Sequence, residues 1–260
     1  MDPLAAKAAL SFVVGGAWIT LALVMAEKLG SKVGGILIAL PSTTLVSMFF
    51  IGWLEGTSYA AQTASLEPFG LVAGGILIFC MVVFLKKYKN KAFLIAICAW
   101  LLAAITIKIM GWKSMLWGSL IYCVMCLAMY WYIEKMMKVP SLKVKAKKYS
   151  LYALAIKACI AGGAVALTVV VAALAGPFWG GVFATLPAAT MAAMYMLNKE
   201  HGPEFAMATG KAVLPASLTM VVFVVAVNIT FPAYGLVLGT LISYGASVAF
   251  AVLTYFVMKK

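Results

Sequence analysis

Two charged side chains lie deep within apolar stretches and are the residues best placed to do chemistry. Glu67 and Lys211 each lie within four residues of a proline, Pro68 and Pro215, inside stretches long enough to cross a membrane. A charge at bilayer depth costs about 2.5–3.5 kcal/mol on insertion scales, so it usually faces the protein interior or a water-filled cavity. Glu67 is therefore a candidate proton or cation carrier. Lys211 is a candidate partner for Glu67 or for an anionic substrate, and a structural ion pair is the alternative.

Two prolines with nearby threonines form a second candidate group. Pro41 is followed by Thr43 and Thr44, and Pro187 is followed by Thr190. A proline lacks a backbone donor and frees an upstream carbonyl, which in lipid must be satisfied by protein or water. These residues predict two broken helices whose exposed backbone binds a substrate or an ion. Two kinked and tightly packed helices are the alternative.

These proline segments are two copies of one motif, offset by 146 residues. Residues 34–44 read GGILIALPSTT, and residues 180–190 read GGVFATLPAAT. Lys7 and Lys157 occupy matching positions near the start of each copy. They are candidate anchors for polar groups near each entrance, with snorkelling to the membrane surface as the alternative. A duplicated glycine and proline motif in two halves points to the central site of a transporter.

The elements that must position these residues are membrane spans. The chain has 260 residues, of which 65% are hydrophobic and only 10% charged, a balance typical of polytopic membrane proteins. A span needs about 20 mainly apolar residues. The predicted fold is therefore an all-α polytopic membrane protein with nine transmembrane helices, at residues 4–26, 34–54, 59–85, 92–109, 112–134, 149–175, 178–198, 204–231 and 233–258.

Lysine placement predicts the orientation of these spans. Most lysines fall on one side, which places the N-terminus outside and the C-terminus in the cytoplasm of a plasma or inner membrane. Five crossings precede the second copy, so it is inverted relative to the first. The predicted domains are a first four-helix repeat at 1–110, a linking span with a basic cytoplasmic loop at 111–148, and a second, inverted four-helix repeat at 149–260.

The net charge of +13 comes from lysines in short loops between apolar spans, which argues against nucleic acid as a partner. The expected partner is the lipid bilayer, whose anionic headgroups face a lysine cluster at Lys143, Lys145, Lys147 and Lys148. The oligomeric state is open, a homo-oligomer included. No metal site and no cofactor are expected, since the single histidine, His201, lies in a polar turn. An enzyme is not expected, because no nucleophile–base set or carboxylate pair is present.

Several short features recur in both halves: an early lysine-alanine, a glycine before a proline-containing helix, a later threonine, and a proline in the third span. The first half carries them over residues 4–109, together with Ala-Trp100-Leu-Leu-Ala-Ala. The second half carries them over residues 153–258, at Lys157, Gly181, Pro187, Thr209, Gly210 and Pro215. In these features each half resembles the GlpM-like family of small four-span membrane proteins. The resemblance implies a fused, inverted pair similar to an antiparallel dimer of such proteins. The first half departs from the pattern at Ser65-Leu66-Glu67, where the family has a glycine.

The leading functional hypothesis is a transporter of a small solute that works by alternating access around a midplane site. A passive ion channel is the second hypothesis, because inverted duplication also builds pores. A non-transporting subunit of an envelope or glycolipid assembly is the third. The identity and charge of the substrate stay open, since Glu67 and Lys211 argue in opposite directions.

Overall fold

The computed structural model describes residues 3–28, 40–140 and 151–258. All regular structure within these ranges is helical, and no strand occurs among them. Five helical stretches in the described chain are long and apolar enough to cross a membrane, at 57–88, 91–110, 115–136, 154–175 and 203–253. The prediction of an all-helical protein with several long apolar helices is therefore confirmed.

The first part of the chain forms helices α1 (Pro3–Lys28), α3 (Ser42–Glu55), α4 (Thr57–Tyr88) and α5 (Lys91–Met110). Gly56 separates α3 from α4 with φ at 96°, a conformation that L side chains rarely adopt. Helix α6 (Met115–Trp131) follows, and the Ser114 side chain caps it by accepting a hydrogen bond from the backbone N–H of Trp117. A π-helical turn, Tyr132–Met136, ends this element.

The second part forms α7 (Leu151–Ala175), α8 (Pro177–Ala184), α9 (Ala188–His201), α10 (Pro203–Ala216) and α11 (Leu218–Met258). The stretch predicted as one span at 178–198 is thus two helices, α8 and α9. Helix α11 changes direction at Gly235, where φ is 75°. This bend lies just inside the span predicted at 233–258, close to its boundary with the span predicted at 204–231. Gly202 separates α9 from α10 with φ at 86°.

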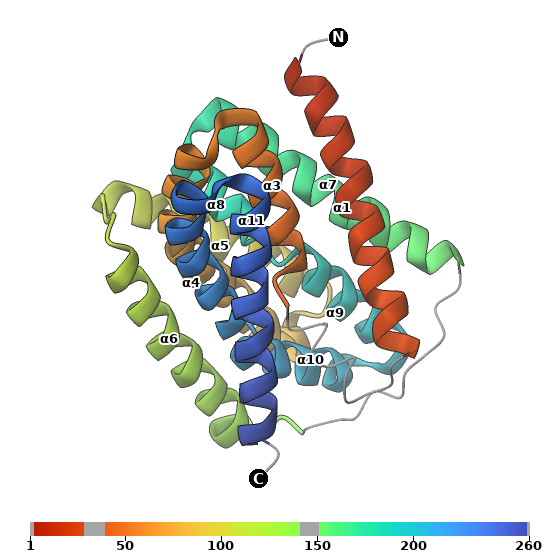
Figure 1. Cartoon of the computed structure of the whole chain (residues 1–260). Helices are drawn as coiled ribbons and strands as arrows, with labels where there is room; N and C mark the ends of the chain where they lie inside the picture. The colour runs from red at the N-terminus through yellow and green to blue at the C-terminus, as the bar shows by residue number, and fades with distance from the viewer. Residues whose placement is uncertain (1–2, 29–39, 141–150, 259–260) are drawn as a thin grey trace.

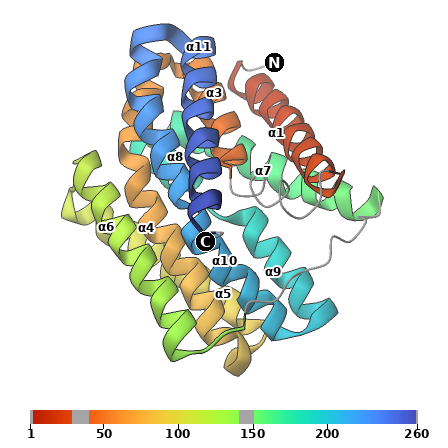
Figure 2. The ribbon, with the colours of Figure 1, turned by 60° about the horizontal axis from the view of Figure 1, so that its bottom comes forward.

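Helix α4 lies among α5, α6, α8 and α11, while α1 crosses α7 to one side of this group (Figures 1 and 2). Glycines permit the close crossing of α1 and α7. A Cβ on Gly16 would lie 2.9 Å from the Ala158 carbonyl oxygen, and one on Gly162 would overlap the Phe12 carbonyl oxygen. Small residues of this kind let helix backbones approach where no hydrophobic force drives helices together in lipid.

Helix α6 lies at one edge of the bundle and exposes an apolar stripe (Figure 1). The stripe follows the helical repeat, at Leu116, Leu120, Val124 and Leu127. An exposed stripe of this composition suits contact with lipid rather than water.

Some predicted features lie outside the described residues. They are the first glycine pair, Gly34 and Gly35, and the lysine cluster from Lys143 to Lys148. Lys157 lies on α7, but its side chain is also outside the described part of the structure.

Candidate functional site

The second proline motif interrupts the stretch predicted as one span at 178–198. Helix α8 ends at Ala184, α9 begins at Ala188, and Pro187 lies at the N-cap of α9. The Thr185 hydroxyl lies 3.1 Å from both the Gly181 and Val182 carbonyl oxygens and donates its proton to them. Carbonyl groups at the end of α8 are thus partly satisfied by Thr185, a residue that could not be singled out from the sequence motif.

The first proline motif meets this break. Pro41 is buried and precedes α3, whose first bond runs from the Leu45 N–H to the Pro41 carbonyl at 2.8 Å. The Thr44 hydroxyl donates to the Ala184 carbonyl at 3.2 Å, and both residues are buried. Thr44 therefore bonds the break between α8 and α9, in the other copy of the motif.

Thr43 and Thr190 occupy the first turns of α3 and α9, and both are half-buried. Their helices begin in the same way, each after a proline with φ near −80° and ψ between 50° and 60°. The two proline motifs are thus alike in local backbone as well as in sequence.

One face of α4 packs along the break between α8 and α9. Thr63, Glu67, Gly70 and Gly74 are spaced by four, three and four residues, which places them on one side of the helix. A Cβ on Gly70 would lie 2.8 Å from the Val182 Cα and 2.9 Å from the Gly181 carbonyl oxygen. A Cβ on Gly74 would lie 3.1 Å from the Thr185 carbonyl oxygen. This spacing is readable in the sequence, but which helix it faces is not.

Glu67 lies on this face, beside the start of the break. A Cβ on Gly181 would lie 3.2 Å from the Glu67 backbone nitrogen and 3.3 Å from its Cγ. Glu67 is fully buried, and within the described residues neither of its carboxyl oxygens has a hydrogen-bond partner. The nearby Thr63 hydroxyl donates to the Tyr59 carbonyl instead. Pro68 follows Glu67 inside α4, where it is buried and does not end the helix.

One of the two candidate roles of Lys211, that of a partner for Glu67, does not occur in the structure. The Lys211 ammonium donates to the Glu134 carboxylate at 2.7 Å and to the Val139 carbonyl at 2.6 Å. Lys211 lies about two turns into α10, close enough to one end for its flexible side chain to reach the π-helical end of α6. Glu134 was missed because it lies at the end of a predicted span, where charged residues are common.

Loss of Glu134 is expected to destabilise the protein more than loss of Lys211. Lys211 is only 3% exposed, so Glu134→Ala leaves a buried ammonium without this carboxylate, whereas Lys211→Met leaves a half-exposed carboxylate that water solvates. Thermal unfolding in detergent should show a drop of several degrees for Glu134→Ala and partial recovery in the double variant with Lys211→Met.

Lys86→Met, which breaks the exposed 3.0 Å pair with Glu204, serves as the control and should change the melting temperature little. Equal effects of Glu134→Ala and Lys86→Met would show that the Lys211 pair carries no special weight.

Lys7 lies near the C-terminal end of α3. Its ammonium is 3.4 Å from the Trp53 carbonyl oxygen and 5.4 Å from the centre of the Trp53 ring. This contact ties α1 to α3 through a cation–π interaction and a weak hydrogen bond. It gives Lys7 a structural partner at the end of the bundle rather than a place beside Glu67.

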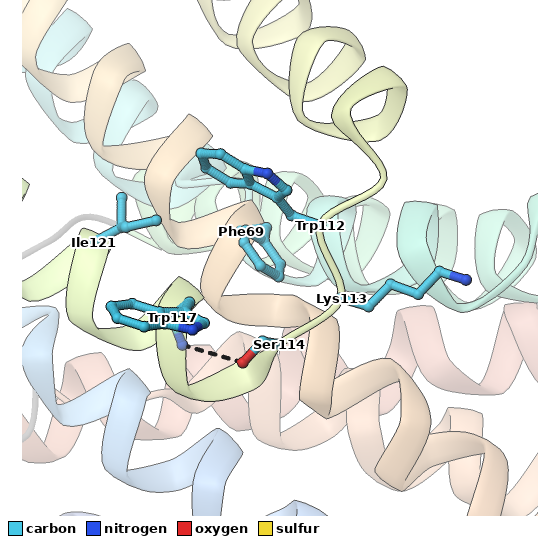
Figure 3. Close-up of a pocket in the computed structure, with 6 residues that line it drawn as sticks. All are labelled: Phe69, Trp112, Lys113, Ser114, Trp117 and Ile121. Carbon is cyan, nitrogen blue, oxygen red and sulfur yellow. Dashed lines mark hydrogen bonds between the residues drawn. The ribbon is translucent and has the colours of Figure 1, made fainter.

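A cavity of about 270 Å³ opens beside the start of α6 (Figure 3), lined by Phe69, Trp112, Lys113, Ser114, Trp117 and Ile121. An adjoining groove of about 410 Å³ runs along α6, lined by Trp117, Leu120, Ile121, Val124 and Met125. Both are mainly apolar. Neither is lined by Pro41, Glu67, Pro187 or Lys211.

No group of three or more metal-binding side chains occurs among the described residues. Residues 8–113 match the model of a family described as "Protein of unknown function (DUF3147)". The match spans α1 to α5 and ends before α6. No curated protein and no solved structure matches the chain.

Proposed function

We propose that this protein transports a small solute across a plasma or inner membrane by alternating access between two inverted repeats. The observation that carries the proposal is the hydrogen bond from Thr44 to the Ala184 carbonyl, which joins the first proline motif to the break at the second. Discontinuous helices that meet in the membrane interior form the binding sites of many transporters, because their free backbone groups can bind solutes and ions.

The proposed repeats are supported by matching helices. Helices α3 and α9 have 14 residues each, start after Pro41 and Pro187, and end before Gly56 and Gly202. Both glycines have positive φ, 96° and 86°. Every one of these boundaries is offset by the same 146 residues as the sequence motif.

Contacts between the halves support a two-fold relation. The alignment of Lys7 with Lys157 pairs each residue of α1 with the residue 150 positions later. Gly162 contacts Phe12, and Gly15 contacts Val165, so both contacts join a residue to its own counterpart. Such contacts are expected where two copies meet at a two-fold axis.

A second pair of contacts follows the same relation between α4 and the α10–α11 segment. The Asn228 side chain donates to the Ala61 carbonyl at 2.9 Å, and a Cβ on Gly210 would meet Val82. When each residue is replaced by its counterpart 146 or 147 positions away, the Ala61–Asn228 contact maps to within about three residues of the Val82–Gly210 contact. The proposal of nine spans arranged four, one and four accounts for this correspondence.

The proposed topology also accounts for contacts near the helix ends. Lys7 with Trp53 and Lys108 with Phe178 join segments that the topology places outside. Lys86 with Glu204 and Lys211 with Glu134 join segments that it places on the cytoplasmic side. The family match to residues 8–113 supports treating the first half as a unit, and a GlpM-like origin of both halves remains part of the proposal.

Cysteine accessibility tests this function without knowledge of the solute. In a variant lacking the five native cysteines, Thr44→Cys is probed with a membrane-impermeant thiosulfonate from each side of oriented vesicles. Lys86→Glu places a carboxylate against Glu204, so it replaces an attraction between α4 and α10 with a repulsion at the proposed cytoplasmic end. Alternating access predicts that this change raises the modification rate from the cytoplasmic side and lowers it from the outer side.

A channel predicts that both rates rise or stay equal, together with a steady conductance in planar bilayers. A non-transporting subunit predicts that Thr44→Cys is unreactive from either side. Lys113→Cys and Lys89→Cys are the topology controls, and they should react only from outside and only from the cytoplasm, respectively. The reverse pattern would overturn the proposed orientation.

A further inference from the structure

Glu67 is an unusual carboxyl group for its position. It is fully buried in a membrane-spanning helix, and among the described residues both of its oxygens lack a hydrogen-bond partner. A structural carboxyl at this depth normally has a partner, because burial of an unpaired charge is costly. The partner expected from the sequence, Lys211, is bonded to Glu134.

Two threonine hydroxyls on this side of α4 are bonded to backbone carbonyls rather than to Glu67. Thr63, one turn before Glu67, donates to the Tyr59 carbonyl at 3.0 Å. Thr185, in the break that faces this side of α4, donates to the Gly181 and Val182 carbonyls. The backbone at Gly181 contacts the Glu67 stem rather than its carboxyl end. Among the described residues, the Glu67 carboxyl thus has neither a cation nor a hydroxyl donor as a partner.

The titratable side chains on α4 and on the helices packed against it do not change this picture. Within the described residues, none of them bonds the Glu67 carboxyl. The other groups bond elsewhere or lie at exposed or partly exposed positions: Tyr59 on the Ala172 carbonyl, Tyr122 on Ser217, Cys126 on the Leu214 carbonyl, Lys211 on Glu134, Lys86 on Glu204, Lys108 over Phe178, Tyr244 against Trp18, and Glu55, Cys80, Lys87, Tyr88, Lys91, Cys98, Cys123 and Tyr234.

We infer that Glu67 is an exchangeable proton site that couples solute movement to a proton gradient. The inference rests on the proposed transport function and names its coupling ion. In the closed arrangement the group is a neutral carboxylic acid. When the α8–α9 break moves away from α4, water reaches the carboxyl, its O–H bond breaks, the proton passes to water, and the electron pair stays on the carboxylate.

A proton fits this site better than a metal cation. Hard cations in proteins are held by about six or more oxygen ligands at short distance. The hydroxyls of Thr63 and Thr185 are already bonded within the site, and no second acidic residue joins Glu67 in a metal-binding group among the described residues. A proton needs one oxygen, which Glu67 supplies.

Infrared difference spectroscopy on the full-length protein in lipid vesicles tests the inference directly. The spectrum of the wild type minus that of Glu67→Gln should show the carbonyl band of a protonated carboxyl at neutral pH. This band should shift slightly in D₂O, as expected for an exchangeable proton. The band should disappear reversibly as the pH is raised. Glu134→Gln should keep the band, and Glu67→Asp should move it.

Three results would overturn the inference. Absence of the band from wild type at neutral pH would mean that Glu67 is ionised, and restoration of a carboxylate signal by sodium alone would assign a metal cation. A band that persists at every pH at which the protein stays folded would make Glu67 a fixed structural acid. A titrating band combined with an unreactive Thr44→Cys would retain the proton site and reject alternating access, so the two proposals fail separately.

Discussion

Glu67→Gln is expected to reduce proton-driven solute accumulation to the level of empty liposomes. Glutamine has the shape of the neutral acid and cannot release a proton, so the carrier loses its coupling without a cavity in the core. In the measurement, an isotope-labelled cell extract is added outside proteoliposomes and a pH gradient of either sign is imposed. Mass spectrometry then identifies the solutes that have accumulated inside. Exchange of the same solutes at equal pH should persist, because glutamine mimics the protonated form of Glu67.

Glu55→Gln is the matched control, since it neutralises an exposed acid at the end of α3. This variant should accumulate solute at the wild-type level. Unchanged accumulation by Glu67→Gln would remove Glu67 from the coupling step. Loss of both accumulation and exchange would assign Glu67 to solute binding instead.

Gly70→Ala is expected to separate α4 from the interrupted segment and to destabilise the protein by about 1–3 kcal/mol, the usual range for overpacking a tight contact. The added methyl would lie 2.8 Å from the Val182 Cα and 2.9 Å from the Gly181 carbonyl oxygen, and backbone atoms cannot move aside alone. Reversible unfolding in detergent measures the change. Because Glu67 lies one turn away on the same face, transport should fall as well.

Gly75→Ala is the matched control on the same buried helix. Its methyl would lie 2.9 Å from the terminal methyl of Met125, which can rotate away at low cost. The expected loss of stability is therefore much smaller than for Gly70→Ala. Similar losses in the two variants would show that the close approach of α4 to α8 is not what Gly70 provides.

The helices and their breaks follow from local physics and could be predicted from the sequence. Long apolar stretches predict helices, because backbone groups in lipid must bond within their own segment. Proline prevents that bonding at a known place, so the interruption before α9 at Pro187 follows from the residue itself. The turns at Gly56 and Gly202 are less visible, since many glycines in apolar helices serve packing instead.

The partners of the polar side chains could not be predicted. Lys211 was a candidate partner for Glu67 or for an anionic substrate, because both are charges near prolines in predicted spans. The structure pairs Lys211 with Glu134, 77 positions earlier in the chain, and leaves the Glu67 carboxyl without a partner among the described residues. Which helices become neighbours depends on packing across the whole bundle, and a pattern within one span does not contain that information.

The sequence by itself determined that the protein is helical, has several long apolar stretches and carries a glycine and proline motif twice. Those features depend on composition, spacing and the chemistry of single residues. Tertiary structure alone decided that Thr44 bonds the Ala184 carbonyl and that the glycine face of α4 lies against the broken segment. Such contacts join residues far apart in the chain, and they form because small side chains let particular helices approach closely in an environment where every polar group needs a partner.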